Sequence, residues 1–509
     1  MARTGETIPG PVPAALGLRR DAVGLREVLF QSITDMAPGA AIAASIPAGT
    51  LYAGGALPLS VLIALVACLF SASSIGLLAR ELPSAGSLAT YAARGLHPAV
   101  GFLTAWGYVL VGVLIAPLVL LQLGFTTAST INSDFPGYPA DLWWPWSLAG
   151  AVIILAAGFY GIRTSARLGT ILGISEIAVF LVLAVFFVVH AGHANTAAVF
   201  TTRYTPKSFR GISGVIAGSV YSVLAFGGFE GAAPLAEEAR NPRRTIPRAV
   251  LLATLSIGLL YVFTTYAVDV AFGPTGFAGF GSSGTASWEG MARSLYGLFW
   301  FFVFLAIVNS TIANANAGMN VASRTGYAMG RIGAFPHLLA RVHLRHRSPV
   351  VAVFATFALT VAVTLGLGLA YNPTNAFAMV GTGIVIVLVA VYIVVNAACI
   401  GYFASPSRRG TGRRWNPLLH LVIPLAGIVA FVPAWLTSAG IRAFSFIAPL
   451  SAPSSYMGPG VAGFIVIGFI YLAYLYIRDP RRITEVGHVH LDAPELEAGT
   501  EVDRGTPQP

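Results

Sequence analysis

The chain has 509 residues, of which 56% are hydrophobic and only 10% are charged, and its mean hydropathy is +0.76. Soluble domains carry about 25% charged residues, so the composition excludes a water-soluble protein and predicts an all-α integral membrane fold. The two cysteines, Cys68 and Cys399, lie in apolar runs, so the sequence offers no disulfide framework and no CxxC metal site.

Twelve segments are apolar and long enough to be transmembrane helices, which need about 20 residues each. They are residues 27–54, 57–80, 98–125, 146–162, 168–190, 211–236, 247–272, 292–320, 349–371, 376–403, 417–438 and 457–477. The N-terminal segment 1–26 lacks the apolar core of a cleavable signal peptide, and the polar tail 479–509 is predicted to be disordered. An even number of spans places both termini on one side of the membrane.

The basic residues indicate which side that is. If both termini are cytoplasmic, five of the 30 Lys and Arg residues face outward and the other 25 face the cytoplasm. The five outward residues are Arg203, Lys207, Arg210, Arg293 and Arg442. This split follows the positive-inside rule, so the formal charge of +10 reflects membrane topology and not a nucleic-acid partner.

Two of the predicted spans contain helix breakers. The first span holds Pro38-Gly39 near its middle, and the sixth is interrupted at "FGGFEG", residues 226–231. Kinked helices are one interpretation, because both residue types disturb a helix. The separation by five helices favours another, in which two five-helix inverted repeats bring broken helices 1 and 6 together at the membrane midplane as a substrate site.

A broken helix exposes backbone groups of both polarities. The N-terminal end of a half-helix has free N–H groups and the positive end of the helix dipole, which suit a carboxylate. Unwound carbonyls suit an ammonium group or a cation. The breaks therefore predict a ligand that carries both charges, such as an amino acid.

Four acidic residues stand out within the predicted spans, where a charge is expensive and therefore a functional candidate. Asp35, one turn before the first break, could bind an ammonium group or a coupling cation, or could cap the broken helix. Glu176 could carry a coupling proton or bind an ammonium group. Glu230 is predicted to bridge the second break by accepting hydrogen bonds from freed backbone donors. Asp269 is predicted to face solvent near the outer end of the seventh span.

The eighth span carries a polar stripe in which Asn309, Asn316 and Asn320 recur at about helical spacing. These side chains could line a cation site or an exit path, or could hold helices together. The histidines show no metal-ligand spacing, and no nucleotide-binding loop is present. We therefore expect no metal and no cofactor, with an ion gradient or substrate exchange as the energy source.

Four stretches resemble one known family, the amino acid–polyamine–organocation (APC) superfamily. They are "ELPSAGSLATYAARGLHPAVGFLTAWGY", "YGIRTSARLGTI", "GFEGAAPLAEEARNPRRTIPRAV" and "NANAGMNVASRTGYAMGRIGAFPHLLARVH". The third is similar to the signature at the sixth helix of that family, where G-F-E, E-E, N-P-x-R and I-P recur in this order. The four matches lie between residues 81 and 343, in the expected order.

The resemblance implies a five-plus-five inverted-repeat core at residues 27–403 and two extra helices at residues 404–478. It implies that the substrate carboxylate binds at the turn formed by Pro38, Gly39, Ala40, Ala41 and Ile42, where this chain departs from the common G-S-G-I-F pattern. It also implies that the amino group binds carbonyls near Ala225, Phe226 and Gly227, and that Phe226 or Phe229 closes over the ligand. Some proton-coupled relatives have a lysine near the position of Glu176.

We therefore predict a secondary active transporter, not an enzyme, that moves amino acids across the plasma (inner) membrane by alternating access. Proton symport or exchange would drive it, with sodium as the alternative coupling ion. A polyamine or amino-alcohol permease of the same fold is the main alternative, because Asp35 and Glu176 would suit a substrate without a carboxylate. A channel or a membrane sensor is less favoured. The expected partners are the substrate, the coupling ion and membrane lipid.

Overall fold

The fold comes from a computed structural model of the chain, which describes residues 23–479 apart from 140, 161–165, 282–286, 332–335, 343–347 and 407–414. Most of the predicted segment 1–26 and nearly all of the predicted tail 479–509 lie outside these residues. Among the described residues the regular structure is helical, and the only β feature is an isolated bridge between Val23 and Ala239. The predicted all-α class is confirmed for this part of the chain.

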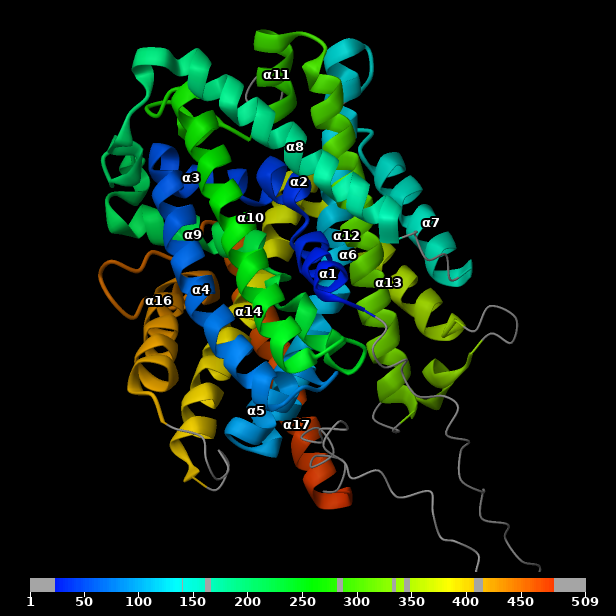
Figure 1. Cartoon of the computed structure of the whole chain (residues 1–509). Helices are drawn as coiled ribbons and strands as arrows, with labels where there is room; N and C mark the ends of the chain where they lie inside the picture. The colour runs from blue at the N-terminus through cyan, green and yellow to red at the C-terminus, as the bar shows by residue number, and fades with distance from the viewer. Residues whose placement is uncertain are drawn as a thin grey trace, which may run out of the picture.

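The helices form one bundle of long, roughly parallel and antiparallel rods (Figure 1). The α-helices are α1 (Leu25–Met36), α2 (Pro38–Ala40), α3 (Thr50–Ala53), α4 (Leu57–Glu81), α5 (Ser87–Gly95), α6 (Pro98–Asp134), α7 (Trp144–Tyr160), α8 (Ala166–Ala191), α9 (Ile212–Phe226), α10 (Pro242–Phe272), α11 (Trp288–Tyr296), α12 (Phe299–Arg331), α13 (Val350–Tyr371), α14 (Pro373–Ala404), α16 (Ile423–Ala439) and α17 (Met457–Arg478).

Short helical turns of other types connect or extend these helices. The π-helical turns are η2 (Ala41–Ser45) and η12 (Leu418–Val422). The 3-10 turns are η3 (Pro47–Gly49), η4 (Gly54–Ala56), η5 (Gly192–Ala194), η6 (Ala197–Phe200), η7 (Lys207–Phe209), η8 (Phe229–Glu237), η9 (Phe277–Gly279), η11 (His337–Ala340) and η13 (Ser454–Tyr456). Of these, η2 and η8 follow the two predicted helix breaks directly.

Ten helical stretches in the described ranges are long and apolar enough to cross a membrane, judged by length and composition. They are Pro47–Glu81, Pro98–Asp134, Thr170–Ala194, Ile212–Glu237, Pro242–Phe272, Phe299–Tyr327, Val350–Tyr371, Pro373–Ala404, Leu418–Ala439 and Ser454–Arg478. Of the other two predicted spans, the first is divided at Ala37 and the fourth is the 17-residue α7. The chain is therefore a multi-pass membrane protein.

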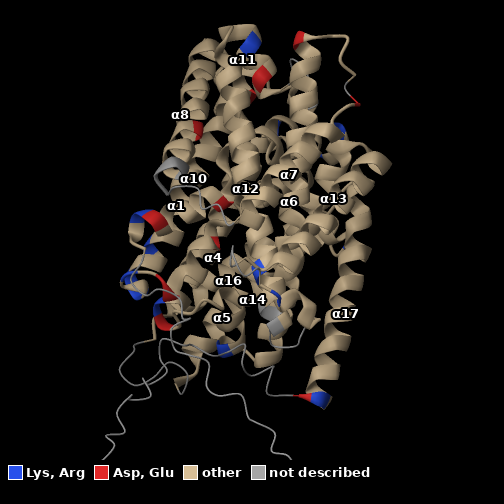
Figure 2. Ribbon diagram, turned by 90° about the vertical axis from the view of Figure 1, so that its right-hand side faces the viewer, with Lys and Arg blue, Asp and Glu red and all other residues tan. Residues whose placement is uncertain are grey.

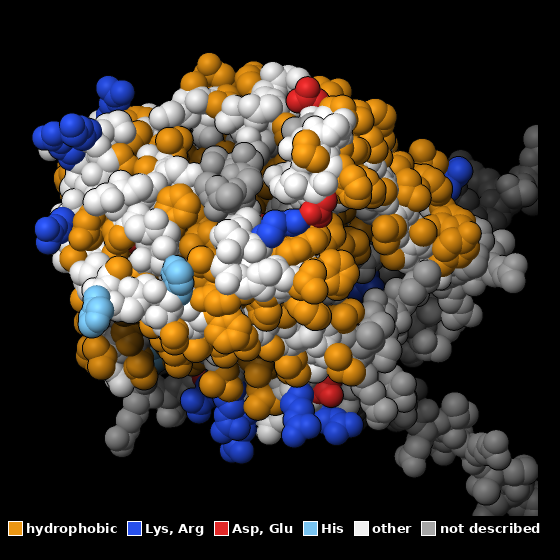
Figure 3. Space-filling view, turned by 90° about the horizontal axis from the view of Figure 1, so that it is seen from above, with side chains coloured by type: hydrophobic (Ala, Val, Ile, Leu, Met, Phe, Trp, Pro, Cys, Tyr) orange, Lys and Arg blue, Asp and Glu red, His pale blue; other side chains and the backbone are white. Residues whose placement is uncertain are grey.

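Charged residues are more frequent at the two ends of the bundle than in its middle. Most Lys, Arg, Asp and Glu positions lie towards the two ends in Figure 2, with few acidic positions between them. Seen from above, the end that carries α11 shows mostly hydrophobic side chains and uncharged surface, with basic groups near its edge and a few charged groups closer to its middle (Figure 3). A membrane protein can keep its middle free of charge because lipid, not water, surrounds that part.

The spans differ in how much of their surface the protein covers. The stretches that contain α6, α9 and α14 are the most buried, whereas α8, α13, α16 and α17 leave most of their residues uncovered. Apolar side chains on the uncovered spans are strongly exposed, for example Val189 at 75% and Ile470 at 65%. Side chains of this kind face lipid in a membrane. The central helices α6 and α14 pack against each other, and α9 packs against α4, α3, α16 and α14.

Candidate functional site

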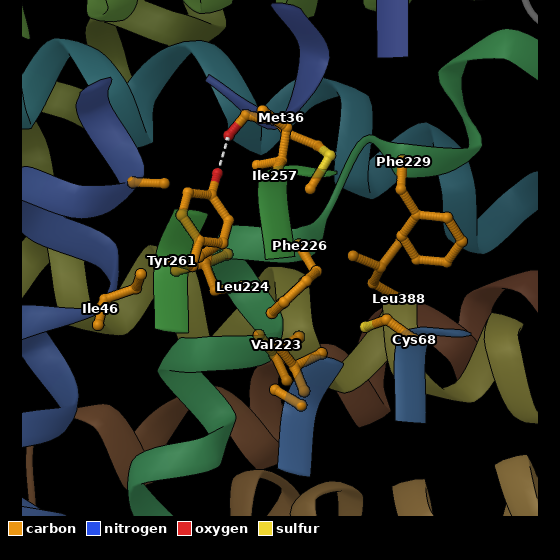
Figure 4. Close-up of a cluster of buried hydrophobic side chains, with 14 of the residues drawn as sticks. Met36, Ile46, Cys68, Val223, Leu224, Phe226, Phe229, Ile257, Tyr261 and Leu388 are labelled. Carbon is orange, nitrogen blue, oxygen red and sulfur yellow. Dashed lines mark hydrogen bonds between the residues drawn. The ribbon is translucent and has the colours of Figure 1, made fainter. Parts of the chain in front are cut away.

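The first helix break lies between α1 and α2. Helix α1 ends at Met36, and Ala37 has a left-handed backbone with φ 45°, after which α2 begins with a proline that cannot continue the hydrogen-bond ladder. Other helices bind the carbonyls at this end. The Tyr261 hydroxyl on α10 donates to the Met36 carbonyl at 3.0 Å (Figure 4), and the Asn314 amide on α12 donates to the Asp35 carbonyl at 2.8 Å.

The turn after this break is enclosed by α6, α8 and α12. The Gln122 amide on α6 donates to the Ala40 carbonyl at 2.9 Å. A Cβ added at Gly39 would lie 3.1 Å from the Ala306 carbonyl oxygen on α12 and 3.4 Å from the Phe180 ring on α8. Any side chain at position 39 would crowd these neighbours, so the glycine allows helices α8 and α12 to approach the backbone closely.

Glu176 on α8 lies beside the same turn. Its side chain is only 4% exposed, and the Asn309 amide on α12 donates to its Oε2 atom at 3.2 Å. The carboxyl also lies close to the Gly39 backbone, since α8 packs against α2. The protein therefore places one of its own carboxyl groups at the turn whose N–H groups were predicted to bind a substrate carboxylate.

The second break follows α9, which ends at Phe226. Gly227 and Gly228 separate α9 from η8, and Gly228 has φ 110°, a conformation that glycine adopts without the steric penalty of other residues. Because α9 ends here, the carbonyls of its last turn, including those of Ala225 and Phe226, face no following helical N–H. The break thus supplies the backbone acceptors that an ammonium group would need.

Glu230 spans this second break. Its Oε2 atom accepts a hydrogen bond from the Gly228 backbone at 3.2 Å, and its side chain is buried. The hydroxyls of Tyr108 on α6 and Tyr392 on α14 donate to its two carboxylate oxygens at 2.7 and 2.8 Å. One carboxylate thereby holds the broken segment against both central helices.

Tyr392→Phe is expected to destabilise the protein by about 1–3 kcal/mol, because the substitution leaves a buried carboxylate oxygen without its hydroxyl donor. Thermal unfolding of the purified protein would measure this as a lower midpoint. Tyr456→Phe is the matched control, since that side chain is 56% exposed. Equal midpoints for the two variants would contradict a stabilising role for the bond to Glu230.

The two breaks are in direct contact. The Ser32 hydroxyl on α1 donates to the Phe229 carbonyl at 2.9 Å and accepts from the Ala232 N–H at 2.9 Å. A Cβ added at Gly228 would lie 2.5 Å from the Asp35 carbonyl carbon, and one added at Gly231 would lie 2.0 Å from Asp35 Oδ2. The glycines of the second break are thus the surface on which Asp35 of the first break rests.

The two candidate lid residues are both fully buried. The Phe226 ring meets the Tyr261 ring edge-on, with centroids 5.4 Å apart (Figure 4). The Phe229 ring lies 5.0 Å from that of Tyr392. Each ring packs against a tyrosine that itself binds one of the two breaks. Either phenylalanine would have to leave this packing to open or close a binding site.

The asparagines of α12 form hydrogen bonds with two different parts of the protein, α8 and the first helix break. Asn309 reaches Glu176, and Asn314, which lies off the predicted stripe, reaches the first break. Asn316 is partly exposed, and its side chain makes no hydrogen bond to the residues that the structure describes. Within the same ranges no three His, Cys, Asp or Glu side chains are grouped so that they could hold a metal ion.

The prediction that Asp269 faces solvent is wrong. Its side chain is 0% exposed, and neither carboxylate oxygen has a hydrogen-bond partner among the described residues. The residues after α10 fold back over the end of this helix, so that Phe272 packs against Phe277 and Phe280. Sequence position alone placed Asp269 near the helix end but gave no sign of this cover.

Several residues at the breaks were not predicted from the sequence. They are Ser32, Tyr108, Gln122, Tyr261 and Tyr392. None lies in a motif of its own, and each comes from a different helix from the groups it binds. Gln122 offered the clearest signal, because an amide inside an apolar span must find a hydrogen-bond partner within the protein.

Two interrupted helices that contact each other inside a multi-pass membrane protein are typical of the class of membrane transporters. The chain belongs to the amino acid permease family, a member of the APC superfamily, because the family model described as "Amino acid permease" matches residues 27–481. The recognition made from the four sequence stretches is confirmed.

Curated relatives with known roles are also permeases. The chain is 27% identical over 389 residues to the low-affinity putrescine importer PlaP of Escherichia coli (strain K12), covering 75% of this chain and 81% of that protein. It is 27% identical over 367 residues to the branched-chain amino acid permease BcaP of Bacillus subtilis (strain 168), covering 68% of this chain and 75% of that one. It is 28% identical over 301 residues to the histidine permease HisP of Lactococcus lactis subsp. cremoris (strain MG1363), covering 56% and 60%. Family and relatives identify a transporter and not an enzyme.

Proposed function

We propose that the chain is a secondary active transporter that moves amino acids across the plasma membrane by alternating access. The observation that carries this proposal is the contact between the two helix breaks at Asp35 and Gly228. The proposed topology has twelve spans, both termini in the cytoplasm, a five-plus-five inverted-repeat core at residues 27–403 and two further helices at residues 404–478. The family match and the amino acid permeases among the relatives support the substrate class.

In this proposal the two breaks bind opposite ends of the substrate. The carboxylate lies at the turn of Pro38, Gly39, Ala40, Ala41 and Ile42. The amino group lies at the carbonyls of Ala225, Phe226 and Gly227, where α9 ends. Phe229 or Phe226 closes over the ligand, Asp35 senses its charge, and Glu230 keeps the second break in shape through its bonds to two tyrosines.

Glu176 links the substrate to a proton. An ionised Glu176 beside Gly39 would repel a substrate carboxylate, since like charges a few ångströms apart in a buried site interact strongly. A protonated Glu176 removes this repulsion and can donate a hydrogen bond. Substrate and proton would then bind together, which is the basis of proton symport.

A polyamine or amino-alcohol substrate is the second candidate. The two carboxyl groups near the first helix break favour it if they are ionised. Ionised carboxylates at Glu176 and Asp35 would attract ammonium groups, and such a ligand has no carboxylate to place at Gly39. The putrescine importer among the relatives is consistent with this chemistry. The two candidates differ in the protonation state of Glu176 that they require.

Ligand-induced thermal stabilisation of the purified protein, measured at several pH values, separates the two candidates. Amino acid binding requires a protonated Glu176, so the stabilisation should grow as the pH falls. Polyamine or ethanolamine binding requires an ionised Glu176, so the stabilisation should grow as the pH rises. An amino acid and its amide form a matched ligand pair that differs only in the carboxylate. Absence of stabilisation by every ligand of both classes would contradict the proposed site.

Counterflow in proteoliposomes tests the carrier mechanism itself. Internal unlabelled substrate should accelerate the uptake of labelled substrate, because a carrier returns faster when it is loaded. A channel would show no such acceleration, and that result would contradict alternating access. Replacement of sodium by choline should leave uptake unchanged if protons provide the coupling.

A further inference from the structure

Away from the proposed transport site, a cavity lies where α4 ends and α10 begins. Its volume is about 720 Å³, and it opens to the surface. It is lined by Arg80, Asn241, Arg243, Arg244, Pro247 and Arg248. Four arginines therefore share one hollow whose lining contains no acidic residue.

The two walls of the cavity are fixed to each other. Arg243 on α10 donates from Nη1 to the carbonyls of Arg80 and Glu81 at the end of α4, at 3.0 and 3.4 Å. Pro247 on α10 lies against Gly76 on α4, since a Cβ added at that glycine would be 3.4 Å from the proline Cβ. The hollow therefore lies at the packed interface between α4 and α10, and the four arginine side chains that line it are exposed.

The entrance to α10 is also well defined. Asn241, which precedes α10, has a left-handed backbone with φ 50°. The Thr245 hydroxyl donates to the Arg240 carbonyl at 2.6 Å, and the Arg240 N–H donates to the Val23 carbonyl at 2.8 Å. These bonds hold the start of α10, whose first two turns carry three of the four arginines, in a set position.

Three of the four arginines that line the cavity have no counter-ion among the described residues. The side chains of Arg80, Arg244 and Arg248 form no ion pair or hydrogen bond with any described residue. Arg244 and Arg248 are four residues apart on one helix, and like charges at that spacing destabilise the helix. An anion bound between them would remove this repulsion. Guanidinium groups bind phosphate through paired hydrogen bonds, so phosphate is the anion that the lining fits best.

We propose that this cavity binds a phosphate group, carried either by the headgroup of an anionic lipid or by a soluble phosphate compound. The proposed topology places it at the cytoplasmic end of the bundle, at the depth where lipid headgroups lie and where basic pockets between membrane helices bind them. The inference does not depend on the identity of the transported substrate, because no lining residue belongs to either helix break.

Binding can be measured on the full-length protein after purification in neutral detergent and removal of lipid. One arm adds phosphatidylglycerol or, as the zwitterionic control, phosphatidylcholine, and counts bound lipids by native mass spectrometry. The other arm adds inorganic pyrophosphate, with sodium chloride at equal ionic strength as its control, and follows the thermal unfolding midpoint. Retention of phosphatidylglycerol but not of phosphatidylcholine, without stabilisation by pyrophosphate, identifies a lipid site. Stabilisation by pyrophosphate identifies a site for soluble phosphate.

The test variant is Arg244→Gln/Arg248→Gln, which removes two guanidinium groups from the cavity. We expect its affinity for the ligand that binds to fall about tenfold or more, the loss typical of one or two charged hydrogen bonds. The matched control is Arg324→Gln/Arg341→Gln, which loses the same charge at two exposed positions outside the cavity and should bind as the unmodified protein does. If the double variant fails to fold, Arg244→Gln alone should show a smaller loss in the same direction.

Two results would overturn the proposal. One is that neither phosphatidylglycerol nor pyrophosphate binds the unmodified protein more strongly than its control compound. The other is that the cavity and control variants lose binding equally, because the effect would then come from the overall surface charge and not from this cavity.

Discussion

Gly228→Ala is expected to reduce substrate uptake to the background of empty liposomes and to lower the thermal unfolding midpoint. Gly228 has φ 110°, where an alanine is strained by about 1–3 kcal/mol. The added Cβ would also lie 2.5 Å from the carbonyl carbon and 2.6 Å from the carbonyl oxygen of Asp35. These are backbone atoms that cannot rotate away, so the two helix breaks would have to separate. Uptake into proteoliposomes with equal amounts of reconstituted protein measures the effect.

Gly440→Ala is the matched control for this substitution. Gly440 also has a positive φ, 79°, but a Cβ there would meet no atom within 4 Å. The control variant therefore reproduces the backbone strain without the collision at the breaks. It should be somewhat less stable than the unmodified protein and should still transport. If the two variants lose uptake equally, strain alone explains the loss, and the contact between the breaks has no special role.

Glu176→Gln is expected to abolish uptake driven by a pH gradient while substrate exchange continues. Glutamine keeps the size and the hydrogen bond from Asn309 but cannot bind or release a proton. If amino acid and proton bind together at the Gly39 turn, the variant resembles the permanently protonated state and can still exchange substrate. Uptake with an imposed pH gradient, and exchange without one, would be measured on the same proteoliposomes.

Asp269→Asn provides the comparison, because Asp269 is a second buried carboxyl on a spanning helix and contacts neither break in any described hydrogen bond. The asparagine variant should retain uptake driven by the pH gradient. If Asp269→Asn loses that uptake and Glu176→Gln keeps it, the coupling proton binds Asp269 on α10 and not Glu176 on α8.

The positions of the breaks could be predicted because they depend on local chemistry. Pro38 lacks an N–H, and the pair Gly227-Gly228 allows a backbone conformation that other residues avoid, so both breaks are visible in the printed sequence. The partners of the breaks could not be predicted in this way. Tyr261 and Gln122 are distant in sequence from the carbonyls they bind, and nothing near them in the chain points to those carbonyls.

The membrane environment, the helical class and the two sites of interruption follow from the sequence, because apolar run length, glycine and proline act through local rules. The family followed from the four stretches that resemble it. Only the tertiary structure decided which side chains bind the breaks, that Glu176 lies beside Gly39, that Asp269 is covered, and that four arginines line one cavity. The physical reason is that a long apolar span shows little preference for which face it buries. Which residues of α6, α8, α10 and α12 face the breaks follows from helix packing across hundreds of residues.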